Sequence, residues 1–396
     1  MTSRHHRPAI FFGTLLLALP TLGACGDSDA GTTTTTTSSG AGTGGAGGSS
    51  TASGGGGAGG GAPVDPLEQA VRATNWAVIP GAPSVGGGAK QDDIFFLDPL
   101  VGWVASGPKG AVYATTDGGA SWQSVLTGDG TFFRSVHFTS PMRGFAGNIG
   151  AGLSPSIDDP TLIYETSDGG TTWTPVTNVT GSAAKGICNI TSVDGTVFAV
   201  GRANAPAHLL RSDDDGASWV SKDLGTWLNM AIDAHFVSAT EGLVVGMGKT
   251  GMKCTVVKTT DGGDSFTQVF ASEITGSLCW KIDFPTPDVG YVAILETLGG
   301  PGRFAKTTDG GATWAELPLP GEEAYPALAA GFISDKIGWM SPESATEPVY
   351  RTFDGGMTWE PDPALTGPIN RFQFVDETTA YAVGAKVWKL ELPGGQ

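Results

Sequence analysis

Apolar residues recur along most of the chain in a pattern that predicts short β-strands. An apolar residue, most often Phe, is followed about six residues later by Gly and a large apolar side chain, as in FFLDPLVGW, VHFTSPMRGF and GFISDKIGW. Each copy predicts a strand, a turn that contains Gly, and a second strand. Seven copies can be aligned when the degenerate CNITSVDGTVF and the C-terminal FQFVDETTAY are included.

A polar turn alternates with this motif. Its six copies read like TTDGGASW, and an Asp carboxylate followed by glycines is suited to accept backbone N–H bonds inside a tight turn. Six such turns on six different repeats cannot converge on one substrate, so we interpret them as structural. Their aspartates are 45 to 51 residues apart and are Asp117, Asp168, Asp214, Asp261, Asp309 and Asp354.

A period of this length with four short strands is typical of propeller blades. There are seven first strands but only six Asp turns, and the N-terminal NWAVIPGAPS resembles the segment that follows each turn. We expect residues 76–80 to supply the missing outer strand of the seventh blade and so to join the two ends of the ring. The sequence therefore predicts an all-β, seven-bladed β-propeller over residues 76–396. It is preceded by a short helix over 64–75, where Asp65 suits the N-cap and Pro66 the first turn.

The alternation of the two motifs resembles the Asp-box (BNR repeat) propellers, and more closely the photosystem II stability/assembly factor family. This resemblance covers residues 76 to 392 and implies a propeller, but we expect a shared fold rather than a shared function. Asp-box propellers include sialidases, for which the resemblance implies a Tyr nucleophile paired with Glu and an arginine triad. Five of the six tyrosines occupy repeat positions of the core, and the arginines are scattered. We therefore expect a protein that is not an enzyme.

The N-terminus predicts export. Residues 1–25 resemble a bacterial lipoprotein signal, with a basic start, the apolar run PAIFFGTLLLALP and the tetrapeptide LGAC, whose Cys25 would be lipidated. Residues 26–63 are nearly all Gly, Ser, Thr and Ala and predict a disordered tether. We expect a protein anchored through its lipid to a bacterial membrane, on the periplasmic or cell-surface side.

The charge restricts the partners. A formal net charge of −17 repels phosphate backbones, so nucleic acid is an unsuitable partner. We find no cluster of metal ligands and no phosphate-binding loop, and we expect no cofactor. His137 and His235 occupy the same repeat position, together with Phe95, Asn189, Asp283, Gly331 and Gln373, and we interpret both histidines as groups that lie between blades or line the channel.

An exported protein folds in an oxidising compartment, which makes its cysteines informative. Cys254 opens the third strand of one blade and Cys279 precedes the first strand of the next, so the two would lie at the same face and are a candidate disulfide. Cys188 occupies a core position of the repeat, shared with Ile94 and Val136, and we expect it to be buried and unpaired.

The partner surface is predicted from aromatic residues outside the repeat. Trp227, Trp280 and Tyr325 lie near the loops that connect blades, where aromatic rings could stack on peptide or sugar. We expect a monomer that binds a protein or glycan there without catalysis. The alternative is a glycoside-acting, sialidase-like enzyme with carboxylates on the same rim, drawn from Glu322, Glu323, Asp233 or Asp283.

Overall fold

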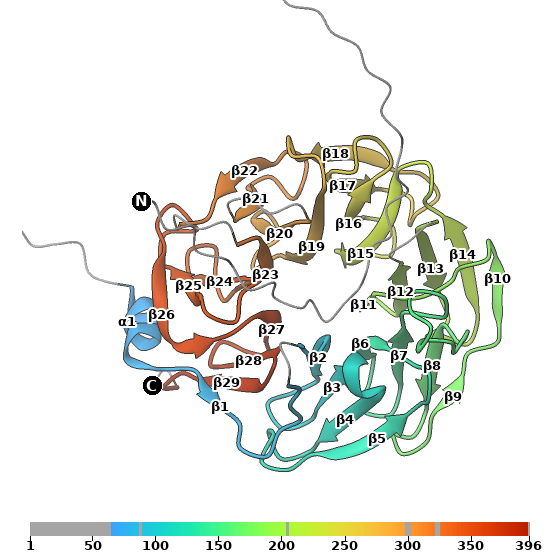
Figure 1. Ribbon diagram of the computed structural model, residues 1–396, viewed down its shortest axis with the longest axis horizontal. Helices are drawn as coiled ribbons and strands as arrows, with labels where there is room; N and C mark the ends of the chain where they lie inside the picture. The colour runs from blue at the N-terminus through green and yellow to red at the C-terminus, as the bar shows by residue number, and fades with distance from the viewer. Residues whose placement is uncertain (1–64, 87–88, 203–205, 298–301, 321–324, 395–396) are drawn as a thin grey trace, which may run out of the picture. The chain divides into compact units, whose positions relative to one another are not determined.

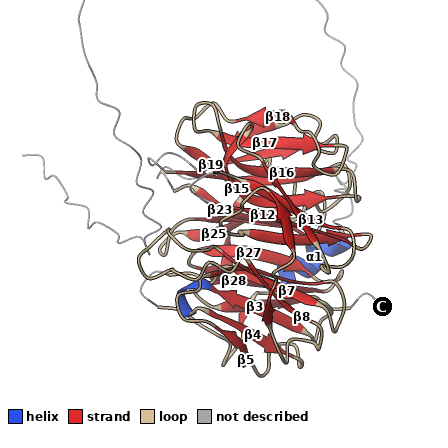
Figure 2. Ribbon diagram, turned by 90° about the vertical axis from the view of Figure 1, so that its right-hand side faces the viewer, coloured by secondary structure: helices blue, strands red, loops and turns tan. Residues whose placement is uncertain are grey.

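The computed structural model describes residues 65–86, 89–202, 206–297, 302–320 and 325–394. The predicted signal peptide with Cys25, the predicted tether, and Glu322 and Glu323 lie outside these ranges. Within them the chain forms seven antiparallel sheets of four strands around a central channel, as predicted, with one added strand in the third blade (Figure 1). Strands make up nearly all of the regular structure (Figure 2).

In each blade the first strand is the innermost, and the following strands succeed it outward. The first blade is β2 (Asp93–Phe96), β3 (Gly102–Ser106), β4 (Ala111–Thr115) and β5 (Gln123–Thr127), with a 3₁₀ turn at Gly107–Lys109. The second is β6 (Phe133–Phe138), β7 (Gly144–Asn148), β8 (Ile163–Thr166) and β9 (Thr174–Pro175). The third is β11 (Asn189–Val193), β12 (Thr196–Gly201), β13 (His208–Ser212) and β14 (Trp219–Asp223), with β10 (Val179–Gly181) added in parallel to β14.

The remaining blades follow the same order. The fourth is β15 (Leu228–Phe236), β16 (Gly242–Gly248), β17 (Cys254–Thr259) and β18 (Thr267–Ala271). The fifth is β19 (Ser277–Asp283), β20 (Gly290–Glu296), β21 (Arg303–Thr307) and β22 (Ala315–Pro318). The sixth is β23 (Ala327–Phe332), β24 (Gly338–Pro342), β25 (Pro348–Thr352) and β26 (Glu360–Thr366). The seventh is β27 (Ile369–Phe374), β28 (Thr379–Gly384), β29 (Val387–Glu391) and the N-terminal β1 (Ala77–Val78).

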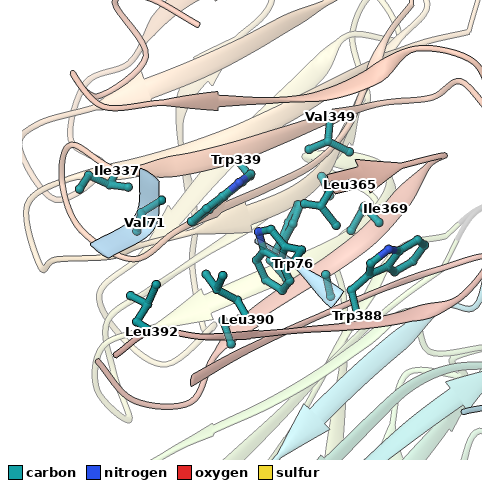
Figure 3. Packing of buried hydrophobic residues seen from close by; sticks show 14 residues of the cluster. Val71, Trp76, Ile337, Trp339, Val349, Leu365, Ile369, Trp388, Leu390 and Leu392 are labelled. Carbon is teal, nitrogen blue, oxygen red and sulfur yellow. The ribbon is translucent and has the colours of Figure 1, made fainter. Parts of the chain in front are cut away.

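The pairing of β1 with β29 closes the ring from the two ends of the described chain, as the motif count predicts. Ala77 lies opposite Lys389, and Val78 lies opposite Trp388. The helix α1 (Pro66–Ala73) precedes this strand. Figure 3 shows how the buried Val71 of α1 and Trp76 pack among the strands of the sixth and seventh blades. The closure therefore rests on apolar burial as well as on backbone hydrogen bonds.

The recurring apolar pair of the sequence is a contact between neighbouring blades. The aromatic residue of a second strand stacks on the Phe of the next first strand, with ring centroids 3.5 Å apart for Trp103 and Phe138. The same stacking joins Tyr381 to Phe96 across the closure at 3.5 Å. This packing requires a glycine at position 102, because a Cβ there would lie 2.4 Å from the Phe96 ring.

Each Asp turn satisfies its own polar groups. Asp117 accepts hydrogen bonds from the Ser121 amide at 2.8 Å and from the Thr115 hydroxyl at 2.8 Å. Gly119, whose φ is +93°, donates its amide to the Thr115 hydroxyl. The hydrogen bonds from Ser121, from its hydroxyl and then its amide, lower the pKa of Asp117 to about 2. The other five turns repeat these contacts, with Asp168, Asp214, Asp261, Asp309 and Asp354 bonded to the residue four positions later.

The register of the third blade differs from the predicted one. Thr191 lies opposite Phe198, as His137 lies opposite Phe145, so Thr191 rather than Asn189 occupies the shared repeat position. Cys188 accordingly lies outside the position of Ile94 and Val136. The reason is a shorter hairpin, in which only Asp194 and Gly195 separate the paired Val193 and Thr196.

Candidate functional site

Arg371 joins three blades across the central channel. Its Nε lies 2.9 Å from Asp93 in the first blade, and its two terminal nitrogens lie 3.1 Å from the carboxylate oxygens of Asp233 in the fourth blade. Burial opposes the charge of this guanidinium, but the two carboxylates outweigh it and raise its pKa. All three donor nitrogens of Arg371 are therefore engaged, and the channel is bridged by ion pairs rather than open.

The end of the channel where the first strands begin is filled by larger side chains. Trp280 donates its indole N–H to Asn370 at 2.9 Å, and the Arg134 guanidinium lies 4.9 Å from the centre of its ring. Arg134 also pairs with Asp92 at 2.8 Å. Trp280 is 6% exposed, so the prediction that it offers an open stacking surface is wrong.

Bulges in the first strands explain this arrangement. The pairing of first and second strands shifts by one residue in five blades, twice in the fourth and once in each of the others, and each shift leaves one residue of the first strand outside the ladder. Such a bulge re-aims a side chain, and three of these residues contact one another in the channel. The six are Arg134, Asn229, Ile232, Trp280, Leu328 and Asn370.

A cavity of about 240 Å³ lies at the other end of the channel, among the ends of the first strands. We call the residues at the shared repeat position the channel ring. Each lies opposite the large side chain of its second strand, close to the face that carries the Asp turns. The channel ring is Phe95, His137, Thr191, His235, Asp283, Gly331 and Gln373, and all of these except Gly331 line the cavity.

The two histidines of the ring are neutral near pH 7. Burial lowers the pKa of both His137 and His235 to about 4. His137 Nε2 lies 2.8 Å from the Ser192 hydroxyl, and its ring packs against Phe95 with centroids 4.6 Å apart. His235 stacks on Phe284 at 4.5 Å. Both therefore line the channel, and each presents an uncharged imidazole to the cavity.

Asp283 is the carboxyl group of the ring. It accepts the Phe332 amide at 2.8 Å, and burial raises its pKa to about 7. Among the described residues no Lys, Arg or His forms an ion pair with it. Asp233, the other described carboxylate of the glycosidase alternative, is fully buried and held by Arg371. The two aspartates thus have opposite surroundings, one in an ion pair and one facing the cavity.

The predicted rim aromatics do not form one surface. Trp227 is partly buried against Phe266, with ring centroids 5.5 Å apart. Tyr325 is partly buried in a recess with Leu319 and Tyr350. Trp280 lies inside the channel. Sequence reasoning counted Arg371 only among the scattered arginines and missed Asp93 and Lys281. The signal for all three was a charged residue within an otherwise apolar first strand.

The cysteines lie as follows. A disulfide bond joins Cys254 and Cys279 of adjacent blades, with Cα atoms 4.5 Å apart. Cys188 is buried with a free thiol.

In the described part of the chain no three acidic, His or Cys side chains gather in a way that could hold a metal ion. No helix in those ranges has the length and apolar character needed to cross a bilayer.

Comparison with known proteins confirms the resemblance inferred from the motifs. The "Photosystem II assembly lipoprotein Ycf48" of Synechococcus sp. (strain CC9902) is 29% identical over 151 residues, which are 36% of this chain and 39% of that relative's length. No family model matches the chain.

Solved structures show the same fold. "YCF48 bound to D1 peptide" has a TM-score of 0.59 at 19% identity and covers 81% of this chain and 97% of that one. "YCF48 from Cyanidioschyzon merolae" gives 0.58 at 17% identity, over 81% and 99%. The GH74 xyloglucanase from Xanthomonas campestris gives 0.58 at 14% identity, over 81% and 54%.

Proposed function

We propose that this protein is a non-catalytic propeller that binds a segment of a partner protein. The main support is the small cavity at the channel ring, which the ion pairs of Arg371 close on the side toward the inside of the channel. At about 240 Å³ it is smaller than the roughly 300–1,000 Å³ of small-molecule sites, so it suits one inserted side chain rather than a whole ligand. The similarity to an assembly lipoprotein, and the peptide named with a structure of the same fold, support a protein partner.

A glycoside-acting enzyme is the second candidate. It is favoured by the fold shared with a xyloglucanase and by the raised pKa of Asp283, a property of acid catalysts. It needs a second carboxyl group about 5–10 Å away that is free to act. Asp93 and Asp233, the nearby aspartates, are both engaged by Arg371. Because neither aspartate is free to act as the second carboxyl group, we favour a binding protein over a glycosidase.

The proposal includes attachment to a bacterial membrane through a lipid on Cys25, outside the cytoplasm. The small residues before Cys25 and the low-complexity stretch after it support this attachment. Cys25→Ser is expected to move the protein from the membrane fraction to the soluble fraction and to abolish labelling with a radioactive fatty acid. Equal labelling of wild type and variant would contradict the lipid anchor.

The test of function uses the full-length protein in detergent against two arrays, one of peptides and one of oligosaccharides. We expect saturable peptide binding and no bond cleavage. Each bound oligosaccharide is then incubated and assayed for reducing ends. Turnover that disappears in Asp283→Asn would overturn the non-catalytic proposal and establish the glycosidase, while binding of glycans alone would replace the protein partner by a sugar.

A further inference from the structure

We propose that the cavity of the channel ring takes one organic cation, an ammonium or guanidinium group, with the Asp283 carboxylate as its counter-ion. On the proposed function, on which this step rests, the cation is a Lys or Arg side chain of the partner. Three observations support this inference: the charges in the channel, the walls of the cavity and the engagement of Arg371 by Asp93 and Asp233.

Charges in the channel balance except at Asp283. Arg371 is matched by Asp93 and Asp233, and the excess negative charge of that triad is offset by the neighbouring Lys281, whose pKa burial lowers to about 8. At the end of the channel where the first strands begin, Arg134 pairs with Asp92, and Lys90 lies 3.9 Å from Glu343. Ionised Asp283 is thus the carboxylate that no described side chain neutralises.

An unpaired, partly buried carboxylate costs free energy unless a cation approaches it. The ionisable groups around Asp283 are Arg371 from β27, Asp233 and His235 from β15, and Tyr291 from β20. His235 is neutral, and each nitrogen of Arg371 is already bonded to Asp93 or Asp233, so neither residue forms an ion pair with Asp283. A guest that brings a positive charge completes the balance, and an anionic guest would have to displace Asp93 or Asp233 from Arg371.

The walls suit the stem of a basic side chain. Phe95, Phe284 and Ile190 line the cavity and would pack against methylene groups, as basic side chains bury their stems against apolar surface. Aromatic faces also attract cations. A neutral imidazole offers one acceptor nitrogen, so His235 can receive an N–H from the guest. The cavity therefore supplies a counter-ion, an acceptor and apolar walls.

The experiment titrates the full-length protein with n-butylammonium and with butylguanidinium, and follows the ring resonances of isotope-labelled His137 and His235. Butylurea and butyrate are the neutral and anionic controls. The titration is run at about pH 7.5, between the pKa values of Asp283 and Lys281, so that both the carboxylate and the ammonium are mostly charged. We expect saturable shifts with both cations and none with the controls.

Asp283→Asn keeps an oxygen that can accept the Phe332 amide but loses the charge, and is expected to weaken cation binding about tenfold or more. The matched control is Asp288→Asn, which removes the same charge from the exposed turn after the same strand. Equal binding by Asp283→Asn and wild type would overturn the inference, as would butyrate or butylurea binding as well as the cations. Should Asp283→Asn fail to fold, Thr191→Lys places an ammonium in the cavity and is expected to exclude the probe; unchanged probe binding would overturn the inference.

A peptide arm separates this inference from the proposed function. A bound peptide is compared with a copy in which one Lys is replaced by norleucine. Loss of binding in the copy, and in Asp283→Asn, supports a partner's side chain as the cation. Peptide binding indifferent to both changes overturns the inference and leaves the proposed function standing. Free amines that bind where no peptide does support the cation site and defeat the protein partner.

Discussion

Trp76 meets Trp339 edge to face, with ring centroids 5.5 Å apart and planes at 89°. Trp339 belongs to the second strand of the sixth blade, while Trp76 immediately precedes β1, which completes the seventh. Trp76 also packs against Phe372 of β27 at 5.8 Å. The segment that closes the ring is therefore wedged between two blades, in addition to pairing with β29.

Trp76→Ala is expected to lower the free energy of unfolding by about 3–5 kcal/mol, because Trp76 is 4% exposed and its loss leaves a cavity between blades. Chemical denaturation gives the value. The matched control is Val78→Ala in β1, where the side chain is 44% exposed and a change within about 0.5 kcal/mol is expected. Equal effects of the two substitutions would show that the wedge contributes nothing to closure.

Reduction of the Cys254–Cys279 disulfide is expected to cost about 3 kcal/mol, since the bond closes a loop with a sequence separation of 25. The measurement compares denaturant unfolding with and without dithiothreitol. The double variant Cys254→Ala/Cys279→Ala should be insensitive to the reductant, whereas Cys188→Ala should respond as wild type does. A wild type indifferent to reduction would refute the stabilising role of the bond.

Arg371→Met is expected to destabilise the fold by about 3–5 kcal/mol, because it leaves Asp93 and Asp233 without their cation. Arg72→Met serves as the comparison. Arg72 pairs with Glu68 and Glu360 at the surface, where an ion pair contributes less than about 1 kcal/mol. Unfolding curves of the two variants decide the matter, and similar midpoints would rule out a structural role for the channel bridge.

Acid is expected to destabilise the propeller through the Asp turns. The pKa of Asp309 falls from the ordinary 3.8 to about 2 in the folded state because of its bonds from Thr313. A depressed pKa means that the stabilisation is present above about pH 4 and is lost as the pH falls toward 2. Urea unfolding across this range should show a weaker pH dependence in Asp309→Asn than in wild type. If the free energy of unfolding changes equally with pH in Asp309→Asn and in wild type, the Asp309 turn does not contribute to acid sensitivity.

The blades and their closure could be predicted because each rests on local chemistry that repeats. The motif of Phe96, Gly102 and Trp103 recurs in the blades for a packing reason. The Phe96 ring covers Gly102, and the Trp103 ring stacks on Phe138 of the next blade. Asp117 recurs because its turn is self-contained. The missing seventh Asp turn then pointed to the N-terminal strand.

The site could be predicted only in part. His137, His235 and Asp283 were placed in one register, and that register lines the cavity. Ion pairs join Arg371 to Asp93 in the first blade and to Asp233 in the fourth. Spacing within one repeat cannot predict such a contact between distant blades. Trp280 was misjudged because a bulge turns it inward, and bulges interrupt the alternation from which exposure is inferred. Asn189 was misplaced because the third hairpin is shorter than the others.

The pairing of β1 with β29 also sets an order of events during synthesis. The first six blades each consist of consecutive residues apart from the parallel β10, so each can assemble as soon as its own segment has emerged. The seventh cannot, because its outermost strand is made first and its three inner strands last. Until β29 arrives, β1 has no partner strand, and its edge is exposed to wrong pairings for most of the translation of the chain.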